Sequence, residues 1–164
     1  MAQSWAGGTM DEQGAAHADA SDGTSPIEHE LEVAVSRARA WDAYVHGLTE
    51  WWLPSLTSTG SGLDRIDVDT HEGGRIVEHG RDGRAIEWGE VTDAVPGECF
   101  AHTFRATHSG DASIVSVTFV DLPEGGTRVR LTHAGWNDSN RQGRGRHAEW
   151  SVLLERYRAY AQHV

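Results

Sequence analysis

The sequence places two histidines where they could transfer protons inside an apolar pocket. His133 alternates with Val129 and Leu131 in one predicted strand, and His102 alternates with Phe104 in another. Because alternate residues of a strand point to the same face, both imidazoles are predicted on the apolar side. Histidine titrates near neutral pH, so the pair could serve as acid and base. A core histidine with satisfied hydrogen bonds is the commoner structural alternative, and it stays open for both.

Glu78 and Ile76 lie on the same face of one predicted strand. If that face points inward, the Glu78 carboxylate lies in the same pocket as these histidines. A buried carboxylate without a partner is costly, so an inward Glu78 is expected to pair with Arg, His or Tyr. The alternative is a Glu78 that is exposed at a strand edge or bound to a turn amide. Glu78, His102 and His133 are therefore the candidate catalytic residues, and the sequence leaves open whether the protein is an enzyme.

Large aromatic residues indicate a ligand pocket. Trp51 and Trp52 adjoin the point where two short helices would meet the opening of a sheet. Large aromatic side chains bury much area and shape apolar pockets, although an ordinary core position is the alternative for this pair. The residues expected to bind a ligand face the same interior, and they are Trp51, Trp52, Glu78, Trp88, His102, Phe104, Val117, Leu131, His133, Trp150, Leu153 and Tyr157.

Motifs for metals and cofactors do not occur. The histidines near predicted loops show no HxH or HExxH spacing, so no metal site is expected, and these histidines are His71, His79, His108 and His147. The glycine pairs at 73–74 and 125–126 are predicted turns, because no Gly-Lys-Ser/Thr follows either pair. We therefore expect no cofactor.

A short basic segment precedes the final predicted helix. Arg141, Arg144 and Arg146 are interleaved with glycines, and they could hold the anionic head group of a ligand. A solvated loop is the alternative. Cys99 is the only cysteine, so no intramolecular disulfide can form, and its parity opposite to Phe100 predicts that it faces away from the pocket.

The first predicted elements are a strand and two short helices. Apolar and polar residues alternate over 27–35, which is typical of a half-buried strand. Ser36 is a predicted N-cap of a helix that ends before Gly47. Thr49 is a predicted cap of one more turn, which Pro54 ends.

A meander and a closing helix follow. Turn residues separate predicted strands over 64–70, 75–79, 86–94, 99–105, 112–121 and 127–134. In the last two strands one face is apolar and the other is polar. From Trp150 to Val164, apolar residues recur at steps of three and four, which predicts a helix that starts near His147 and covers the apolar sheet face.

Composition limits the partners. The chain has 164 residues, 14 arginines and no lysine, and 25 carboxylates give a formal charge of -11. This excess of negative charge argues against nucleic acid and anionic membranes. No run is apolar and long enough to span a membrane, and no secretory signal precedes the folded part, so a cytoplasmic location is expected. Residues 1–25 are predicted to be a disordered leader, and residues 26–164 a single domain.

A series of short motifs covers the predicted domain: Trp41, the Trp51-Trp52 pair, Gly73-Gly74-Arg75 with Glu78, Asp82-Gly83, Trp88-Gly89-x-Val91, Pro96, Gly126-Thr127-Arg128-Val129, Leu131-x-His133-x-Gly135 and Trp150. In this order and spacing the chain resembles the SRPBCC superfamily, in particular bacterial members similar to the activator of Hsp90 ATPase homologue. The resemblance implies an α+β helix-grip (START-like) fold. In that fold a curved antiparallel sheet of about seven strands, two short helices and a long C-terminal helix enclose a cavity.

Three functions follow from these observations. The first is binding of a small apolar or aromatic molecule in the cavity between the sheet and the C-terminal helix. The second is a cyclase- or hydrolase-like activity that uses Glu78, His102 and His133. The third is a chaperone-accessory or stress-related interaction through the polar sheet face, with the protein a monomer or a homodimer.

Overall fold

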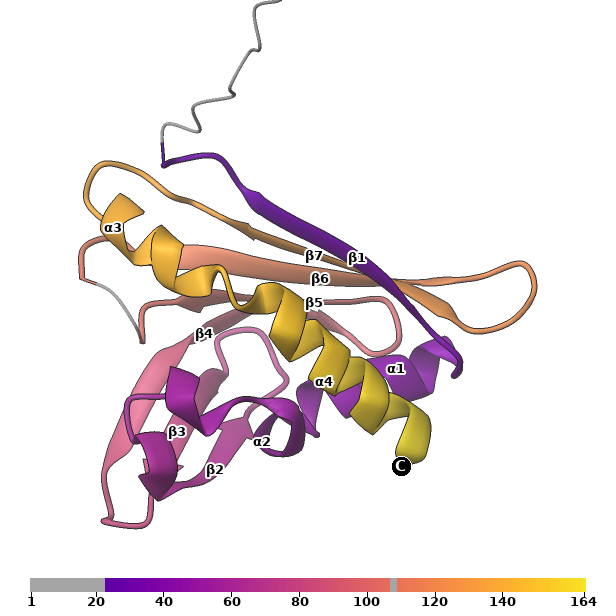
Figure 1. The fold of residues 1–164 in the computed structure, drawn as a ribbon, viewed down its shortest axis with the longest axis horizontal. Coiled ribbons are helices and arrows are strands. Elements are labelled where there is room, and N and C mark those ends of the chain that lie inside the picture. Colours follow the sequence, from indigo (N-terminus) through magenta and orange to yellow (C-terminus); the bar gives the residue numbers. More distant parts are fainter. Residues whose placement is uncertain (1–22, 107–108) are drawn as a thin grey trace, which may run out of the picture.

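The computed structural model describes residues 23–106 and 109–164. Its main element is a seven-stranded antiparallel sheet with the order β1-β7-β6-β5-β4-β3-β2 (Figure 1). The strands are β1 (Ile27–Val33), β2 (Leu63–Val68), β3 (Arg75–Gly80), β4 (Ala85–Val95), β5 (Cys99–Phe104), β6 (Ser113–Asp121) and β7 (Thr127–Ala134). The expected disordered leader, residues 1–25, lies outside the described residues except for 23–25.

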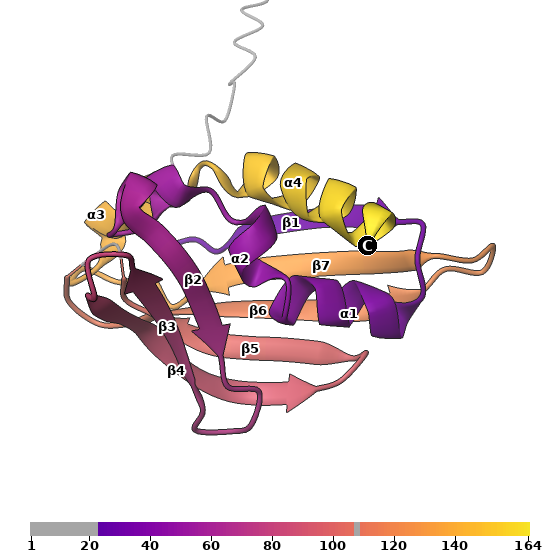
Figure 2. The ribbon, with the colours of Figure 1, turned by 90° about the horizontal axis from the view of Figure 1, so that it is seen from below.

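Helices cover one face of this sheet (Figure 2). They are α1 (Arg37–Val45), α2 (Leu48–Trp51), α3 (Arg141–Arg144) and α4 (Trp150–His163), with the short 3-10 helices η1 (Pro54–Leu56), η2 (Gly60–Gly62) and η3 (Gly145–His147). Ser36 caps α1 as predicted, because its Oγ accepts the N–H of Arg39 at 3.4 Å. The Tyr157 hydroxyl of α4 donates to the carbonyl of Ala40 in α1 at 2.7 Å, which joins the two covering helices. The predicted helix-grip architecture is confirmed.

The predicted capping role of Thr49 is wrong. Gly47 precedes α2 without any side-chain capping bond. Instead, the Thr49 hydroxyl accepts the N–H of Ile66 at 2.9 Å and donates to its carbonyl at 3.3 Å. Strand β2 lies at the edge of the sheet, where one side of each strand backbone has no neighbouring strand. Thr49 therefore satisfies the backbone hydrogen-bonding groups of an edge strand and does not cap a helix.

Strict alternation in β6 and β7 produces the buried face. Val115, Val117 and Phe119 of β6 are buried, while Thr118 between the last two is exposed. The opposite face of the sheet carries ion pairs between β1 and β7, in which Glu30 binds Arg128 at 3.2 Å and Arg130 at 2.5 Å. The first face therefore packs under the helices, and the second faces solvent.

Strand β4 contains the irregularities that bend the sheet. Ile76 of β3 pairs with Gly89, while the next residue pairs with Glu87, so Trp88 is an extra residue in β4. A second shift lies between Val91 and Asp93. Bulges of this kind bend the strand and redirect side chains. Trp88 and Val91 are consequently both buried although they are three residues apart.

Helix α4 starts later than the sequence indicates. The predicted start near His147 is replaced by Trp150, and residues 141–147 form α3 and η3. Glu149, between η3 and α4, has φ -80° and ψ 2°, which interrupts a continuous helix. At 1.5 Å per residue, the 14 residues of α4 span about 21 Å.

We predict that Gly89→Ala lowers the free energy of unfolding by about 1–3 kcal/mol, as overpacked substitutions do. A Cβ at Gly89 would lie 1.8 Å from the carbonyl oxygen of Thr103, so the backbone of β4 or β5 would have to move. Urea denaturation followed by circular dichroism measures the loss. Gly62→Ala is the matched control, since its Cβ would meet no atom within 4 Å. Equal stabilities of the two variants would contradict the close approach of β4 to β5 at Gly89.

Candidate functional site

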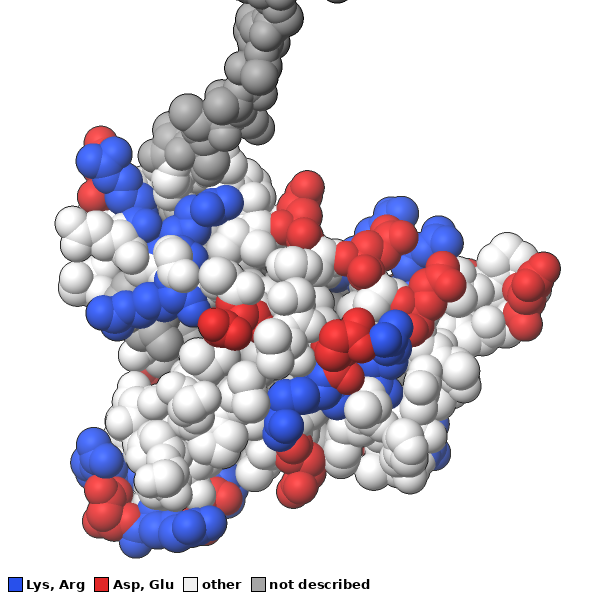
Figure 3. Space-filling view, viewed as in Figure 1, with Lys and Arg blue, Asp and Glu red and all other residues white. Residues whose placement is uncertain are grey.

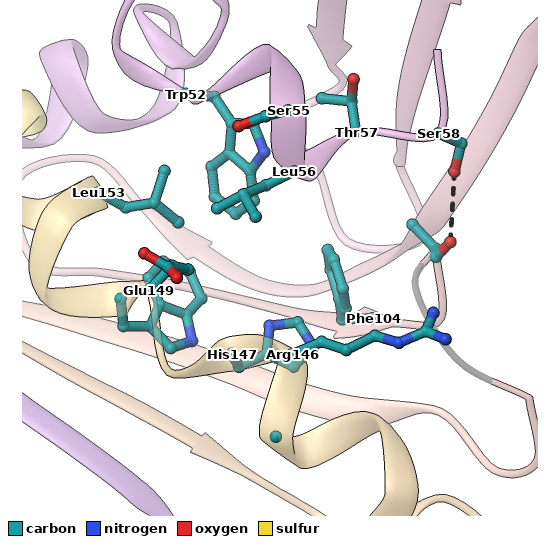
Figure 4. A pocket seen from close by; sticks show the side chains of 13 residues that line it. Trp52, Ser55, Leu56, Thr57, Ser58, Phe104, Arg146, His147, Glu149 and Leu153 are labelled. Carbon is teal, nitrogen blue, oxygen red and sulfur yellow. Dashed lines mark hydrogen bonds between the residues drawn. The ribbon is translucent and has the colours of Figure 1, made fainter. Parts of the chain in front are cut away.

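A pocket of about 430 Å³ opens between η1, the end of β5 and the start of α4 (Figure 4). Its apolar wall is made by Trp52, Leu56, Phe104, Trp150 and Leu153. Polar and small residues complete the lining, and they are Ser55, Thr57, Ser58, Ala106, Gly145, Arg146, His147 and Glu149. A concave, mostly apolar site with a few polar groups at its edge is the usual form of a small-molecule site.

The wall next to η1 is ordered by local hydrogen bonds. Pro54 begins η1, where a missing N–H is tolerated, and its carbonyl accepts the Thr57 hydroxyl at 2.7 Å. The Ser58 hydroxyl donates to the carbonyl of Ala106 at 3.4 Å, which joins the loop after η1 to the segment after β5 (Figure 4). Two segments far apart in sequence thus meet at the rim of the pocket.

Glu78 holds that same loop from inside the protein. Its side chain is fully buried, and its carboxylate accepts the N–H groups of Thr59 at 2.6 Å and Ser58 at 3.2 Å, and the indole N–H of Trp88 at 2.8 Å. Burial raises the pKa of Glu78, but the hydrogen bonds from Thr59, Trp88 and Ser58 outweigh it, so the pKa lies below the ordinary 4.5. The expected pairing with Arg, His or Tyr is wrong, because backbone amides and an indole supply the donors. Glu78 is therefore ionised, and both of its carboxylate oxygens accept hydrogen bonds from the protein itself.

His133 is the centre of a buried chain of hydrogen bonds. The indole Nε1–H of Trp150 can only donate, so His133 Nδ1 accepts it at 3.0 Å. His133 Nε2 must then carry the proton, and it donates to the Ser113 hydroxyl at 2.7 Å, which donates to the carbonyl of Phe104 at 3.1 Å. Both ring nitrogens are thus engaged, and they fix the first turn of α4 to β7 and β6.

His102 lies deeper, beside a void of only about 10 Å³. Its Nδ1–H donates to the carbonyl of Thr103 at 2.8 Å. Burial lowers the pKa of His102 to about 4, and the bond to Thr103 opposes that shift. The void is enclosed mainly by large side chains, which are Tyr44, Val45, Leu48, Trp52, Trp88, Phe100, Phe104 and Trp150. The protein's own residues fill the concave sheet face, and they leave room for about one water molecule.

The twelve residues expected to bind a ligand are all buried, but they divide into three groups. Trp52, Phe104, Trp150 and Leu153 line the 430 Å³ pocket. Trp88 and His102 line only the small void. The other six line neither space, and they are Trp51, Glu78, Val117, Leu131, His133 and Tyr157. The three catalytic candidates are consequently not brought together around the pocket.

His147 is a pocket residue that the sequence analysis placed near a predicted loop and did not include among the ligand-binding residues. It is only 7% exposed, and its ring lies 4.4 Å from that of His133 and 5.2 Å from that of Phe104, between centroids. Its position three residues before Trp150 puts the two side chains on one face of a helical segment. That spacing is the sequence signal that could have identified it.

One wall residue carries an unsatisfied donor. Trp52 is 4% exposed, and its indole N–H has no hydrogen-bond acceptor among the residues that the structure describes. The ring is instead held by aromatic contacts, with centroids 4.8 Å from Trp88 and 5.5 Å from Trp150. Aromatic packing therefore determines the position of this side chain, although it leaves a buried N–H without a hydrogen bond.

Within residues 23–106 and 109–164, no group of three or more His, Cys, Asp or Glu side chains could hold a metal ion. Over the same residues, no helix is long and apolar enough to cross a membrane.

The Cys99 thiol donates to Asp93 at 3.3 Å, and burial raises its pKa, so it is poorly suited to act as a nucleophile.

The family model of the Activator of Hsp90 ATPase homolog 1-like proteins matches residues 34–162, and the chain belongs to this family. The resemblance inferred from the sequence motifs is thus confirmed. Among curated proteins, none matches the sequence.

Solved structures share the fold. A protein from Mesorhizobium loti has a TM-score of 0.64 and 19% identity, over 83% of this chain and 96% of that chain. The Aha1 dimer from Colwellia psychrerythraea has a TM-score of 0.62 and 18% identity, over 85% and 98%. An anthrahydroquino-gamma-pyrone synthase has a TM-score of 0.55 and 24% identity, over 82% and 96%. At these identities the likeness concerns the fold.

We predict that Glu78→Gln lowers the free energy of unfolding by about 1–3 kcal/mol at pH 7, because the buried amides and the Trp88 indole lose a charged acceptor. Hydrogen exchange should become faster at the amides of Ser58 and Thr59 in particular. Glu87→Gln on the neighbouring strand is the control, since Glu87 is exposed and pairs with Arg75. Unchanged exchange at both amides would show that Glu78 does not hold the loop.

His102 should remain neutral in the folded protein until the pH approaches 4. The unfolded chain takes up this proton near 6.5, so the contribution of His102 to stability is present above pH 6.5 and is lost as the pH falls from 6.5 towards 4. Side-chain NMR titration measures the pKa directly, and His102→Leu should remove part of the stability loss over that range. A His102 pKa near 6.5 would contradict the buried position.

Proposed function

We propose that this protein binds a small apolar or aromatic molecule in the 430 Å³ pocket between η1, β5 and the start of α4. The observation that carries the proposal is the wall of Trp52, Phe104, Trp150 and Leu153, four large buried side chains that border open space. Transfer of apolar ligand surface from water to such a wall is favourable by about 25 cal/mol per Å².

Contacts within the protein hold the wall in place. Trp150 is held by His133, and Trp52 is wedged between Trp88 and Trp150. A preformed site loses little conformational entropy on binding, which favours affinity for a small molecule. The proposed site lies at the end of the covering helix, because the space deeper in the sheet is nearly filled.

The other two functions receive less support. Glu78 and both nitrogens of His133 are engaged in structural hydrogen bonds, and none of the three catalytic candidates lines the pocket. The synthase and the Aha1 dimer are similar in fold alone, so neither activity nor dimerisation transfers from them. The pocket of this chain is the feature on which the proposal rests.

A neutral probe tests the proposal. We expect 1-naphthamide to bind saturably in calorimetric titration, and we expect Gly145→Trp to weaken that binding at least about tenfold. Gly145 lines the pocket in a helical conformation, and a Cβ there would meet no atom within 4 Å, so an indole can be added beside the pocket without displacing core residues. Ten-fold weaker binding corresponds to about 1.4 kcal/mol.

Gly62→Trp is the matched control, because Gly62 has the same open surroundings but lies outside the pocket. It should bind the probe as the wild type does. In amide NMR spectra of the wild type, the probe should shift the resonances of Leu153 and the indole of Trp150. Absence of saturable binding, or equal binding by wild type and Gly145→Trp, would refute the proposed site.

A further inference from the structure

The three arginines of the basic segment have different surroundings. Arg141 forms an ion pair with Asp138 at 3.4 Å, and Arg144 donates to the carbonyl of Ser25 at 2.7 Å. Arg146 alone among the three lines the pocket, and its side chain extends along the pocket rim (Figure 4). Arginines gather on the surface around α3 (Figure 3). One of them therefore contributes positive charge to the proposed ligand site.

Opposite charges lie at the two ends of the pocket. Arg146 extends towards Ser58, whereas the Glu149 carboxylate lies at the other end, near Leu153 (Figure 4). Besides His147, these are the only ionisable side chains among the described residues that line the pocket. The apolar residues Leu56 and Phe104 lie between them (Figure 4). The pocket thus has a cationic end, an apolar middle and an anionic end.

A second concavity adjoins the cationic end. This groove, of about 420 Å³, shares Ala106 and Arg146 with the pocket, and small or polar residues line the rest of it, including Ser139, Gln142 and Gly143. A charged group at Arg146 would therefore face a polar, open groove on its outer side. An apolar ligand body would remain on the inner side.

We propose that the ligand class is an apolar or aromatic carboxylate, with its acidic group paired to Arg146 and its apolar body on the wall of Trp52, Phe104 and Trp150. This inference rests on the proposed function. A planar guanidinium binds a carboxylate through two parallel hydrogen bonds, which gives orientation as well as affinity. Glu149 repels a carboxylate from the other end, so the two charges act together to set one orientation.

The size of the effect follows from exposure. Arg146 is exposed, and ion pairs of exposed groups are weak and screened by salt. We therefore expect the wild type to bind 1-naphthoate about two- to fivefold more tightly than the neutral isostere 1-naphthamide in low salt at pH 8. The difference should shrink when salt is raised to about 0.3 M.

Calorimetric titration of both probes into four variants tests the assignment. Arg146→Gln should make the affinities for the two probes nearly equal. Arg146→Lys should retain part of the preference, since it keeps the charge and loses the planar fork. Glu149→Gln should raise the ratio of 1-naphthoate to 1-naphthamide affinity. Arg141→Gln, the matched control outside the pocket, should behave as the wild type.

The two proposals fail in different ways. If both probes bind saturably with equal affinity in the wild type, the carboxylate preference is overturned and the apolar site stands. If the preference persists in Arg146→Gln, another cation provides it and the assignment to Arg146 is overturned. If neither probe binds, both proposals are refuted.

Discussion

The structure depends on the filling of a concave sheet by its own aromatic side chains. Trp52 lies against Trp51, Trp88 and Trp150, with centroid distances of 4.8 to 5.5 Å, and Phe104 lies against Trp88 at 5.6 Å. Interiors pack at the density of organic crystals, and here that packing leaves an inner void of about 10 Å³. Among the described residues, the mostly apolar space on this face of the sheet lies between η1 and the start of α4.

This filling also determines the chemistry of the buried polar groups. A carboxylate or imidazole inside an aromatic core is tolerated only when its hydrogen bonds are made. Glu78 meets that requirement through the amides after η1 and the Trp88 indole, and His133 meets it through Trp150 and Ser113. Groups that could have been catalytic thus act as positioning residues, and each holds one side of the pocket. Glu78 orders the loop that contains Ser58, and His133 orders the first turn of α4.

The positions of the charged side chains also depend on the tertiary structure. On the exposed sheet face, Arg128 and Arg130 are paired with Glu30 and Glu32 of β1, so the charges of these two arginines are neutralised locally. At the other end of the molecule, α3 and η3 bring arginines beside the pocket, although the chain has a formal charge of -11. Local placement, and not net charge, therefore sets what this site can attract.

The sequence by itself determined the sheet, the cap at Ser36 and the inward direction of His102 and His133, because strand alternation and turn residues are local properties. The tertiary structure decided the partners of Glu78, the burial of His147 and the interruption before Trp150. It also decided that only four of twelve expected residues border the pocket. These outcomes depend on how segments far apart in the chain approach one another and fill volume, and periodicity contains no information on either.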